Sequence, residues 1–442
     1  MAKSTKVLVW ILAVMVVVAL GCGGWYYFGY AKDGKSKKKA TTSEGAKTSD
    51  SSVTNEYSSI TASAESIGYA NYPNGIDSEI ATWRINLVKL SDLATTNKDF
   101  TTDFYLTSSG FESVSANDAV QWSKDGTVFA YSYGDEGGMM PAEVANSLKL
   151  ILIKDGTATT VLENFEPYQI PKWKLMPDGN SIIYFKAYPL DETNIDDLNY
   201  AIFKYDIVAG THTGLESDSD YGGGGSPIFA SADSSKFYLI KSKEVGESRK
   251  LYRFQFDFAS SDSESEELLL DGVDASRAFM NSFSESDVSI SPDGTKIAYR
   301  YKISESIHGV ALYDMTDGSS EDLYNPGEKK SVNNFAWTPD SKTLAFDTTY
   351  FGQGDGAGEE LKLVAVNVET NAQTILAEST VSSGLSGALL ALGWSPDGKK
   401  LAYIGGSSLK YYNIDTSASV EVAQAPTGNN GFSLKGFEWV GY

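Results

Sequence analysis

Cysteine and histidine are almost absent from this 442-residue chain, which contains one Cys and two His. The one cysteine, Cys22, precedes the large polar part of the chain, so that part has no disulfide, no thiolate metal site and no cysteine nucleophile. Proline is also scarce, at 12 residues, and long stretches of Leu, Ala, Glu and Lys with helical periodicity are hard to find. His212 and His308 lie close to predicted hairpins, where we expect structural rather than catalytic roles.

Basic residues are outnumbered, since 36 Lys and Arg face 58 Asp and Glu and leave a net charge of −22. The charge is uneven, because residues 1–39 carry seven Lys and one Asp, a net of +6, and the rest carries −28. Such an acidic body repels phosphate backbones, so we expect no nucleic-acid partner. Aromatics and glycine are abundant, with 26 Tyr, 20 Phe and 41 Gly, and they favour one large all-β domain with many turns.

The first 30 residues contain one long hydrophobic run, which extends over residues 7–30. A run of about 20 apolar and aromatic residues is long enough to span a bilayer as an uncleaved signal-anchor. Alternatively, "VALGC" resembles a bacterial lipoprotein signal, which would make Cys22 the lipidated first residue after cleavage, although the usual Leu three places before the Cys is Ala19 here. Both alternatives tether the protein to a membrane.

The direction in which the body faces depends on two opposing signals. The basic cluster after the hydrophobic run favours a cytoplasmic body, whereas the signal-like start favours export. The cysteine-free, Ser-, Thr- and Gly-rich body favours the periplasm or the cell surface. Because residues 31–58 are polar and poor in apolar side chains, they predict a flexible stalk. We therefore expect a membrane segment over 1–30, a stalk over 31–58 and a folded extracytoplasmic domain over 59–442.

A ten-residue pattern recurs through this domain, for example as "ISPDGTKIAY" at 290–299 and "WSPDGKKLAY" at 394–403. Pro fixes φ, Asp bonds back to the backbone and Gly accepts the positive φ, so each copy predicts a tight β-hairpin. A second pair of strands follows each copy, and four strands in 47 to 60 residues are typical of a propeller blade. The turn aspartates of the six copies are Asp125, Asp178, Asp233, Asp293, Asp340 and Asp397.

The chain ends contain a seventh unit in two parts. "GFEWVGY" at 436–442 matches the start of the repeat and "ESIGYANY" at 65–72 matches its continuation. Pairing of these N- and C-terminal strands would close the ring and remove exposed sheet edges. The motif "(W)SPDGxx(I/L)AY" with its downstream hairpin resembles the TolB-type, WD40-like β-propeller repeat over roughly residues 60–442. The resemblance implies an all-β fold, a seven-bladed β-propeller of four-stranded blades, preceded here by the N-terminal membrane segment.

Proteins with this repeat act as extracytoplasmic interaction modules or form the propeller half of peptidases. A nucleophile elbow, G-x-S-x-G, is missing, since "SGLSGALL" at 383–390 has the wrong spacing. We therefore predict no catalytic residues and no enzyme activity, and expect non-catalytic binding of a protein or an envelope polysaccharide. The alternatives are a glycan-active enzyme with paired carboxylates, and a purely structural scaffold.

Unequal connections between the hairpins indicate where such a partner binds. In a propeller, links between the second and third strands of a blade emerge on the same face as links between blades, and here they vary widely in length. Apolar candidates on this face are Tyr133, Met139, Met140, Tyr188, Tyr350 and Phe351. The acidic segments "PLDETNIDDLNY" and "ESDSDYGGGG" offer oxygen ligands suited to calcium, although neither matches the EF-hand pattern. The calcium candidates are Asp191, Asp196, Asp197, Asp218 and Asp220, and we expect no other cofactor.

Overall fold

The computed structural model of the protein describes residues 62, 64–71, 82–101, 104–106, 120–135, 149–163, 173–191, 194–218, 228–245, 248–258, 264–270, 287–304, 307–350, 360–380, 389–405, 408–424 and 434–442. The chain divides into two compact units, Met1–Ser51 and Ser52–Tyr442, and the described residues all belong to the second. Within these residues there is no helix, hence none with the length and apolar character of a membrane span. The predicted membrane segment, with Cys22, and the predicted stalk lie outside the described residues.

The described residues form 29 strands in six hydrogen-bonded sheets, four of which contain four antiparallel strands each. The first sheet, in order of pairing, contains β29 (Leu434–Val440), β1 (Ser66–Asn71), β2 (Thr82–Lys89) and β3 (Thr95–Thr101). The second contains β12 (Thr211–Asp218), β11 (Asn194–Asp206), β10 (Ser181–Asp191) and β9 (Trp173–Leu175). The third contains β13 (Ile228–Ala230), β14 (Lys236–Val245), β15 (Ser248–Asp257) and β16 (Glu264–Leu270). The fourth contains β25 (Leu389–Trp394), β26 (Lys400–Gly405), β27 (Ser408–Asn413) and β28 (Ala418–Gln424).

The remaining two sheets are larger. The fifth contains β4 (Phe104–Leu106), β6 (Val128–Asp135), β7 (Lys149–Lys154) and β8 (Thr157–Glu163), and β5 (Val120–Trp122) also pairs with β6. The sixth sheet has eight strands, namely β17 (Val288–Ile290), β18 (Lys296–Ser304), β19 (Ile307–Asp314), β20 (Ser320–Tyr324), β21 (Lys330–Trp337), β22 (Thr343–Tyr350), β23 (Glu360–Asn367) and β24 (Ala372–Thr380). Its first and last four strands meet at one parallel pair, His308 with Ser331.

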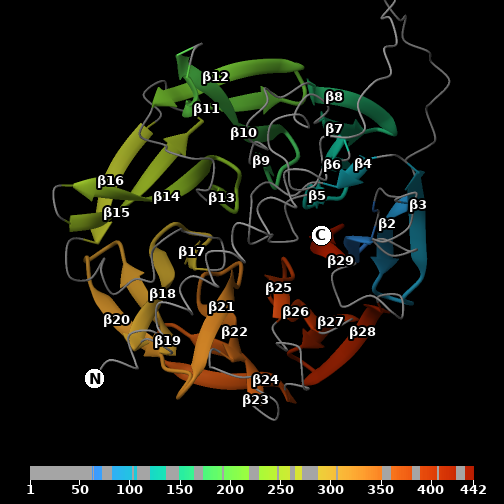
Figure 1. Ribbon diagram of the computed structural model, residues 1–442. Coiled ribbons are helices and arrows are strands. Elements are labelled where there is room, and N and C mark those ends of the chain that lie inside the picture. Colours follow the sequence, from blue (N-terminus) through green and yellow to red (C-terminus); the bar gives the residue numbers. More distant parts are fainter. Residues whose placement is uncertain are drawn as a thin grey trace, which may run out of the picture. The chain divides into compact units, whose positions relative to one another are not determined.

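These sheets stand around a common centre, with β5, β9, β13, β17, β21, β25 and β29 innermost (Figure 1). The prediction of an all-β propeller built from four-stranded blades is confirmed. The prediction of seven separate blades is wrong for the described strands, because four sheets have four strands, a fifth has this arrangement with one additional strand, and the other eight strands form one sheet. The merger depends on one backbone pair, which leaves no mark in the sequence pattern.

The predicted closure of the ring by the chain ends is confirmed. The C-terminal strand β29 pairs with β1 from Ser66 opposite Val440 to Asn71 opposite Leu434. Beyond this strand, the backbone N–H groups of Gly441 and Tyr442 donate to the carbonyl oxygen of Lys124 at 3.0 and 3.2 Å. The first sheet is therefore completed by strands from both chain ends, and β1 is paired on both sides, with β29 and with β2.

The repeated turns have the geometry that their residues predict. In the first copy, Asp125 Oδ1 accepts hydrogen bonds from Ser123 Oγ at 2.6 Å and from the backbone N–H of Thr127 at 3.0 Å. Gly126 adopts a φ of 74°. The turn aspartate therefore has a structural role. The corresponding bonds from Ser or Thr to aspartate in other copies are Ser231 to Asp233, Ser291 to Asp293, Thr338 to Asp340 and Ser395 to Asp397.

Neighbouring units of the ring are joined by tryptophans that lie three residues before the turn aspartate, or at the matching place in β29. The rings of Trp337, Trp394 and Trp439 are buried, and in these three the Nε1–H donates to a backbone carbonyl of the preceding innermost strand. A buried carbonyl without such a donor would cost about 1–3 kcal/mol. The pairs are Trp337 to Ser289 at 3.4 Å, Trp394 to Ala336 at 3.1 Å and Trp439 to Gly393 at 2.8 Å.

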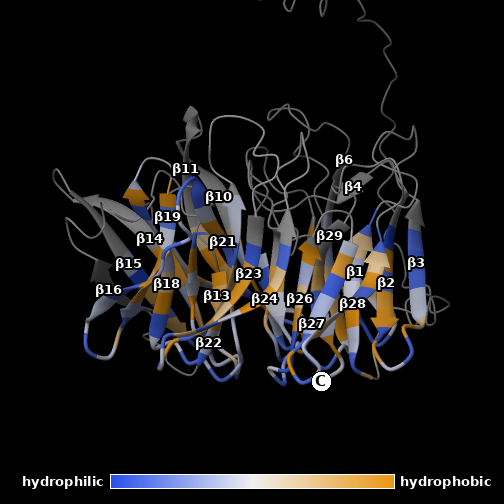
Figure 2. Cartoon of the chain, turned by 90° about the horizontal axis from the view of Figure 1, so that it is seen from below, coloured by the Kyte–Doolittle hydropathy of each residue, from blue (hydrophilic) through white to orange (hydrophobic). Residues whose placement is uncertain are grey.

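The ring has two unlike faces (Figure 2). The tight turns of the aspartate hairpins and the C-terminal residue lie together on one face, which we call the turn face. At the opposite face, which we call the loop face, the second strand of each unit ends and the third begins. A ligand that enters the centre of the ring must therefore pass one of two chemically different surfaces.

Candidate functional site

The loop-face residues predicted from the sequence do not form a describable site. The sequence predicts loops at Tyr133, Tyr188 and Tyr350, whereas the structure places these residues in β6, β10 and β22. The remaining candidates, Met139, Met140 and Phe351, lie outside the described residues. The strands are longer than the sequence indicated because backbone pairing continues past the apolar alternation that marks their beginning, as in Tyr188 opposite Asn199.

The predicted calcium ligands also lie on strands. Asp191, Asp196, Asp197 and Asp218 belong to β10, β11 and β12, so the acidic segment expected to be a loop is a long hairpin that closes with Asp191 opposite Asn194. Asp220 lies outside the described residues. Among the residues that the structure describes, no group of three or more His, Cys, Asp or Glu is placed to hold a metal ion.

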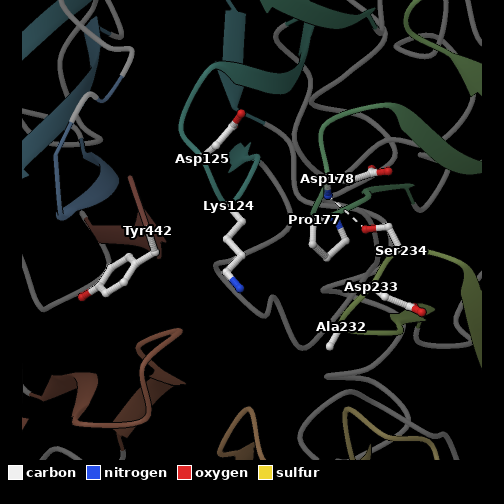
Figure 3. Close-up of a pocket in the computed structure, with 8 residues that line it drawn as sticks. All are labelled: Lys124, Asp125, Pro177, Asp178, Ala232, Asp233, Ser234 and Tyr442. Carbon is white, nitrogen blue, oxygen red and sulfur yellow. Dashed lines mark hydrogen bonds between the residues drawn. The ribbon is translucent and has the colours of Figure 1, made fainter.

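A hollow of about 300 Å³ opens on the turn face, at the centre of the ring (Figure 3). It lies where the turns of three successive units meet the C-terminal residue. This volume is at the lower limit of small-ligand sites, which suits one or two sugar units or a compact acid. The lining residues are Lys124, Asp125, Pro177, Asp178, Ala232, Asp233, Ser234 and Tyr442.

The charged side chains around this hollow point in different directions. The ammonium of Lys124 projects into the space between the three turns, whereas the carboxylates of Asp125, Asp178 and Asp233 point away from it (Figure 3). The carboxylates are held by their own turns, and hydrogen bonds from Ser231 and Ser235 lower the pKa of Asp233 to about 2. The Lys124 ammonium therefore lies inside the hollow, and three carboxylates lie around its rim.

The adjoining turns fix this arrangement through the backbone. The N–H of Lys124 donates to the carbonyl oxygen of Pro177 at 2.8 Å, and the N–H of Asp178 donates to Ser234 Oγ at 3.0 Å. The hydroxyl of Tyr442 donates to Glu65 Oε1, which also accepts from Lys400 Nζ. Each turn is thus tied to its neighbour, so the Lys124 ammonium extends from a rigid base.

Lys124 is an exception in the repeat. It occupies the position directly before the turn aspartate, which we call the rim position. A lysine stands there once in six copies, whereas the other copies have residues without charge. The rim positions are Lys124, Pro177, Ala232, Pro292, Pro339 and Pro396.

A second exception lies deeper in the ring, four residues before the turn aspartate or at the matching place in β29. We call this the inner position. Three consecutive units of the ring have long polar side chains at this position, and these side chains interact. Of the other four units, one has a phenylalanine there and three have small residues. In chain order the inner positions are Gln121, Lys174, Phe229, Ser289, Ala336, Gly393 and Glu438.

The three polar inner positions form a connected group. Lys174 Nζ lies 4.0 Å from Glu438 Oε1. Gln121 is buried between them, and its amide donates to the carbonyl oxygen of Trp173 at 3.3 Å and accepts from the N–H of Leu175 at 2.9 Å. The side chains of Lys174 and Glu438 keep 31% and 22% of their surface exposed, although both belong to innermost strands.

Glu438 is the titratable group of this site. Burial raises the pKa of its carboxyl to about 7, while the Lys174 ammonium and the backbone N–H of Trp122 act in the opposite direction. A carboxyl with this pKa exchanges a proton at neutral pH, which is the property that acid–base groups in binding and catalytic sites share. The sequence analysis missed Glu438, Lys174, Gln121 and Lys124, which become visible only when the repeats are aligned on the turn aspartate and compared position by position.

A second polar group lies between the two halves of the eight-stranded sheet. Arg300 contacts Asp287 Oδ1 at 2.5 Å and donates to Asn333 Oδ1 at 2.8 Å. His308 is 1% exposed, and burial together with the Arg300 and Lys302 charges lowers its pKa to about 4. Because Asp287 and His308 are almost inaccessible to solvent, this group holds two strands together rather than offering a binding surface.

No protein-family model matches the chain, and no curated protein matches it. Solved structures do resemble it. A prolyl endopeptidase has a TM-score of 0.52 and 13% identity over 84% of this chain, which spans about half (52%) of that protein. An oligogalacturonate lyase in complex with manganese has a TM-score of 0.49 and 13% identity, covering 83% of this chain and 87% of its own. TolB from Acinetobacter baumannii has a TM-score of 0.41 and 15% identity, covering 81% and 79%.

The fold is that of a β-propeller. At such low identity the likeness shows the fold alone, and this fold is the one that the repeat resemblance implies. The prediction that the chain is not an enzyme is contradicted, because a solved propeller similar to it belongs to an enzyme, the prolyl endopeptidase. Lack of the G-x-S-x-G spacing in this sequence therefore does not decide against catalysis on a propeller.

Proposed function

We propose that the protein is a membrane-tethered, extracytoplasmic β-propeller that binds a small anionic ligand in the centre of the ring, entered from the turn face. We count seven blades in it, taking the eight-stranded sheet as two, because its halves share the single pair His308 and Ser331. The tether and the extracytoplasmic location are supported by the hydrophobic run over residues 7–30 and by the cysteine-free body.

The Lys124 ammonium carries this proposal. In a chain with a net charge of −22, it projects into a small hollow whose neighbouring carboxylates are turned outward. A hydrogen bond between an ammonium and a ligand carboxylate or sulfate is charge-assisted, and such bonds contribute more than neutral ones. An anionic sugar, such as the end group of an envelope polysaccharide, combines the required charge with a size that suits about 300 Å³.

Direct binding tests the proposal. The full-length protein in detergent is titrated calorimetrically with glucuronate and with sulfate, and neutral glucose is the control ligand. We expect the Lys124→Gln variant to bind glucuronate about tenfold more weakly than the wild type, since one charge-assisted bond is lost. The matched control is Lys399→Gln, because Lys399 is 60% exposed on another turn and contacts Asp415 at 3.6 Å. Equal loss in both variants, or no binding by the wild type, would contradict the proposal.

A catalytic role is the second candidate, and the pKa of about 7 at Glu438 supports it. A single carboxyl of this kind suits general acid catalysis on a bound sugar. The paired-carboxylate arrangement considered from the sequence requires two facing carboxyls, and those of Asp125, Asp178 and Asp233 point outward instead. Product formation from a panel of uronic-acid oligosaccharides, lost in Glu438→Gln and kept in Lys399→Gln, would identify the activity.

The loop face stays a predicted surface for a protein or polysaccharide partner, since its candidate residues Met139, Met140 and Phe351 lie outside the described residues. The form of the tether is a separate question. Mass spectrometry of the N-terminal peptide distinguishes the alternatives, because a lipoprotein begins with a lipidated Cys22 and an anchored protein keeps residues 1–21.

A further inference from the structure

The segment that precedes β1 contacts the same turn that carries Lys124. The backbone N–H of Ala62 donates to the carbonyl oxygen of Gly126 at 3.2 Å, and a Cβ at Gly126 would lie 2.7 Å from the Cβ of Ala62. In addition, the N–H groups of Gly441 and Tyr442 donate to the carbonyl oxygen of Lys124. The turn that carries Lys124 is therefore bonded both to residues before β1 and to residues after β29.

Glu65 joins these two segments to each other. Its Oε1 accepts hydrogen bonds from the Tyr442 hydroxyl and from Lys400 Nζ. Lys400 Nζ also lies 3.9 Å from Oδ2 of Asp397, in the turn between β25 and β26. Burial, together with the bond to Glu65, raises the pKa of Tyr442 above its usual value, so its hydroxyl stays protonated and is the donor. We call Glu65, Lys400 and Tyr442 the closure group.

We infer that the closure group positions Lys124 for the ligand, so that closure of the ring and binding in the hollow stabilise each other. The inference rests on the proposed function and adds a positioning residue, Glu65, which is not among the described residues that line the hollow. Tyr442 makes the connection, because its hydroxyl bonds to Glu65 while its backbone N–H bonds to Lys124. By thermodynamic linkage, the factor by which the closure group raises the affinity is the factor by which the ligand favours closure.

Charge alone predicts the opposite result for Glu65. Removing a carboxylate beside the hollow would strengthen the attraction for an anion, whereas removing a contact that holds the site in place weakens binding. Tyr442→Phe separates the two effects further, since it changes no charge and keeps the ring that lines the hollow, but removes the hydroxyl that reaches Glu65. If the closure group acts by position, both variants lose affinity.

Calorimetric titration of the full-length protein in detergent with glucuronate measures the coupling. We expect Tyr442→Phe and Glu65→Ala to bind glucuronate about fivefold more weakly than the wild type, at the lower end of coupling between two sites. Glu65→Gln loses the same charge but keeps an acceptor oxygen for the Tyr442 hydroxyl, so its affinity should lie between those of Glu65→Ala and the wild type. The matched control is Glu378→Ala, which removes a carboxylate 3.6 Å from Lys362 and should leave the affinity unchanged.

Hydrogen exchange gives the reciprocal readout in the wild type, without any variant. Saturating glucuronate should slow exchange of the backbone N–H groups of Ala62, Gly441 and Tyr442, because these groups bond to the turn that carries Lys124. In Tyr442→Phe the slowing should be smaller. Exchange at these groups that glucuronate leaves unchanged in the wild type would overturn the inference, even if a variant folds poorly.

The outcomes separate the inference from the proposed function. If the wild type binds glucuronate and the Tyr442→Phe and Glu65→Ala variants bind it equally well, the inference is wrong while the proposed function stands. Tighter binding by Glu65→Ala with unchanged binding by Tyr442→Phe would show that charge alone acts, and would also overturn the inference. If the wild type does not bind glucuronate, the proposed function is wrong and the inference with it.

Discussion

The charge of Glu438 should make this propeller less stable at alkaline pH, and Glu438→Gln should remove that effect. A carboxyl whose pKa is raised by folding, here from 4.5 to about 7, binds more protons in the folded state than in the unfolded chain between these values. Stability from this group therefore increases as the pH falls through the window, and the full cost of ionisation is present above pH 7. A neutral glutamine has no such cost at any pH.

The magnitude follows from the size of the shift. A change of 2.5 pKa units corresponds to about 3 kcal/mol at high pH, of which a small part is already present at pH 5 because the unfolded glutamate is largely ionised there. The free energy of unfolding of Glu438→Gln, relative to wild type, should therefore increase by about 2.5 kcal/mol between pH 5 and pH 8.5. Water reaches 22% of the side chain and screens part of its charge, so this value is an upper bound.

Urea unfolding of the full-length chain in detergent, followed by tryptophan fluorescence at pH 5 and pH 8.5, measures the difference. Comparing the variant with the wild type at each pH cancels the contributions of all other titrating groups. Glu369→Gln is the control, since Glu369 lies 56% exposed on a turn beside Lys342. The reasoning is refuted if the difference in unfolding free energy between wild type and Glu438→Gln is the same at both pH values within about 0.5 kcal/mol. The carboxyl would then have the same pKa in the folded and the unfolded protein.

Three further predictions concern the joints between sheets. His308 has a pKa lowered from 6.5 to about 4, so its contribution to stability is complete above pH 6.5 and is lost as the pH falls. Between pH 7 and pH 5 the wild type should therefore lose about 2 kcal/mol of unfolding free energy that His308→Gln does not lose. Urea unfolding of both proteins at the two pH values measures this difference. Trp394→Phe leaves the Ala336 carbonyl without its donor and should lower the free energy of unfolding by about 1–3 kcal/mol, measured by urea unfolding. Gly68→Ala would place a Cβ 2.8 Å from the Trp122 ring, and overpacking of about 1–3 kcal/mol should lower the thermal midpoint; an unchanged midpoint would contradict the packing described.

The sequence predicted the fold because the aspartate turn is needed identically in every unit. The same hydroxyl-to-aspartate bond and positive φ recur at Asp125, Asp293 and Asp397. Even Ser234 and Ser341 adopt φ values of 59° and 61° at the place where the other four copies have glycine. The number of sheets was less predictable, since the merger of two units depends on one parallel pair of backbone groups. Strand ends were also hard to predict, as β10 and β11 continue through an acidic segment without apolar alternation.

The site was not predicted because it consists of single residues within the most regular part of the chain. Lys124 precedes the turn aspartate at a place where proline is the common residue, and a lysine in a turn indicates nothing by itself. Glu438 lies in a short terminal segment whose membership of the ring depends on closure with β1. Its raised pKa results from burial by neighbouring strands that are far apart in the sequence, so no local pattern could indicate it.

The residues that depart from the repeat pattern are of two kinds, which differ in how deeply their side chains are buried. Arg300 and Asp347 replace apolar or small residues at equivalent places in adjacent units, yet the Asp347 and Asp287 carboxyls are 1% and 5% exposed and their contacts are within the protein. Glu438 and Lys174 are equally exceptional, but about a quarter of each side chain remains exposed, and Lys174 Nζ lies 4.0 Å from Glu438 Oε1. The first group is buried and bonded within the protein, and so stabilises a joint. The second retains both charge and contact with solvent.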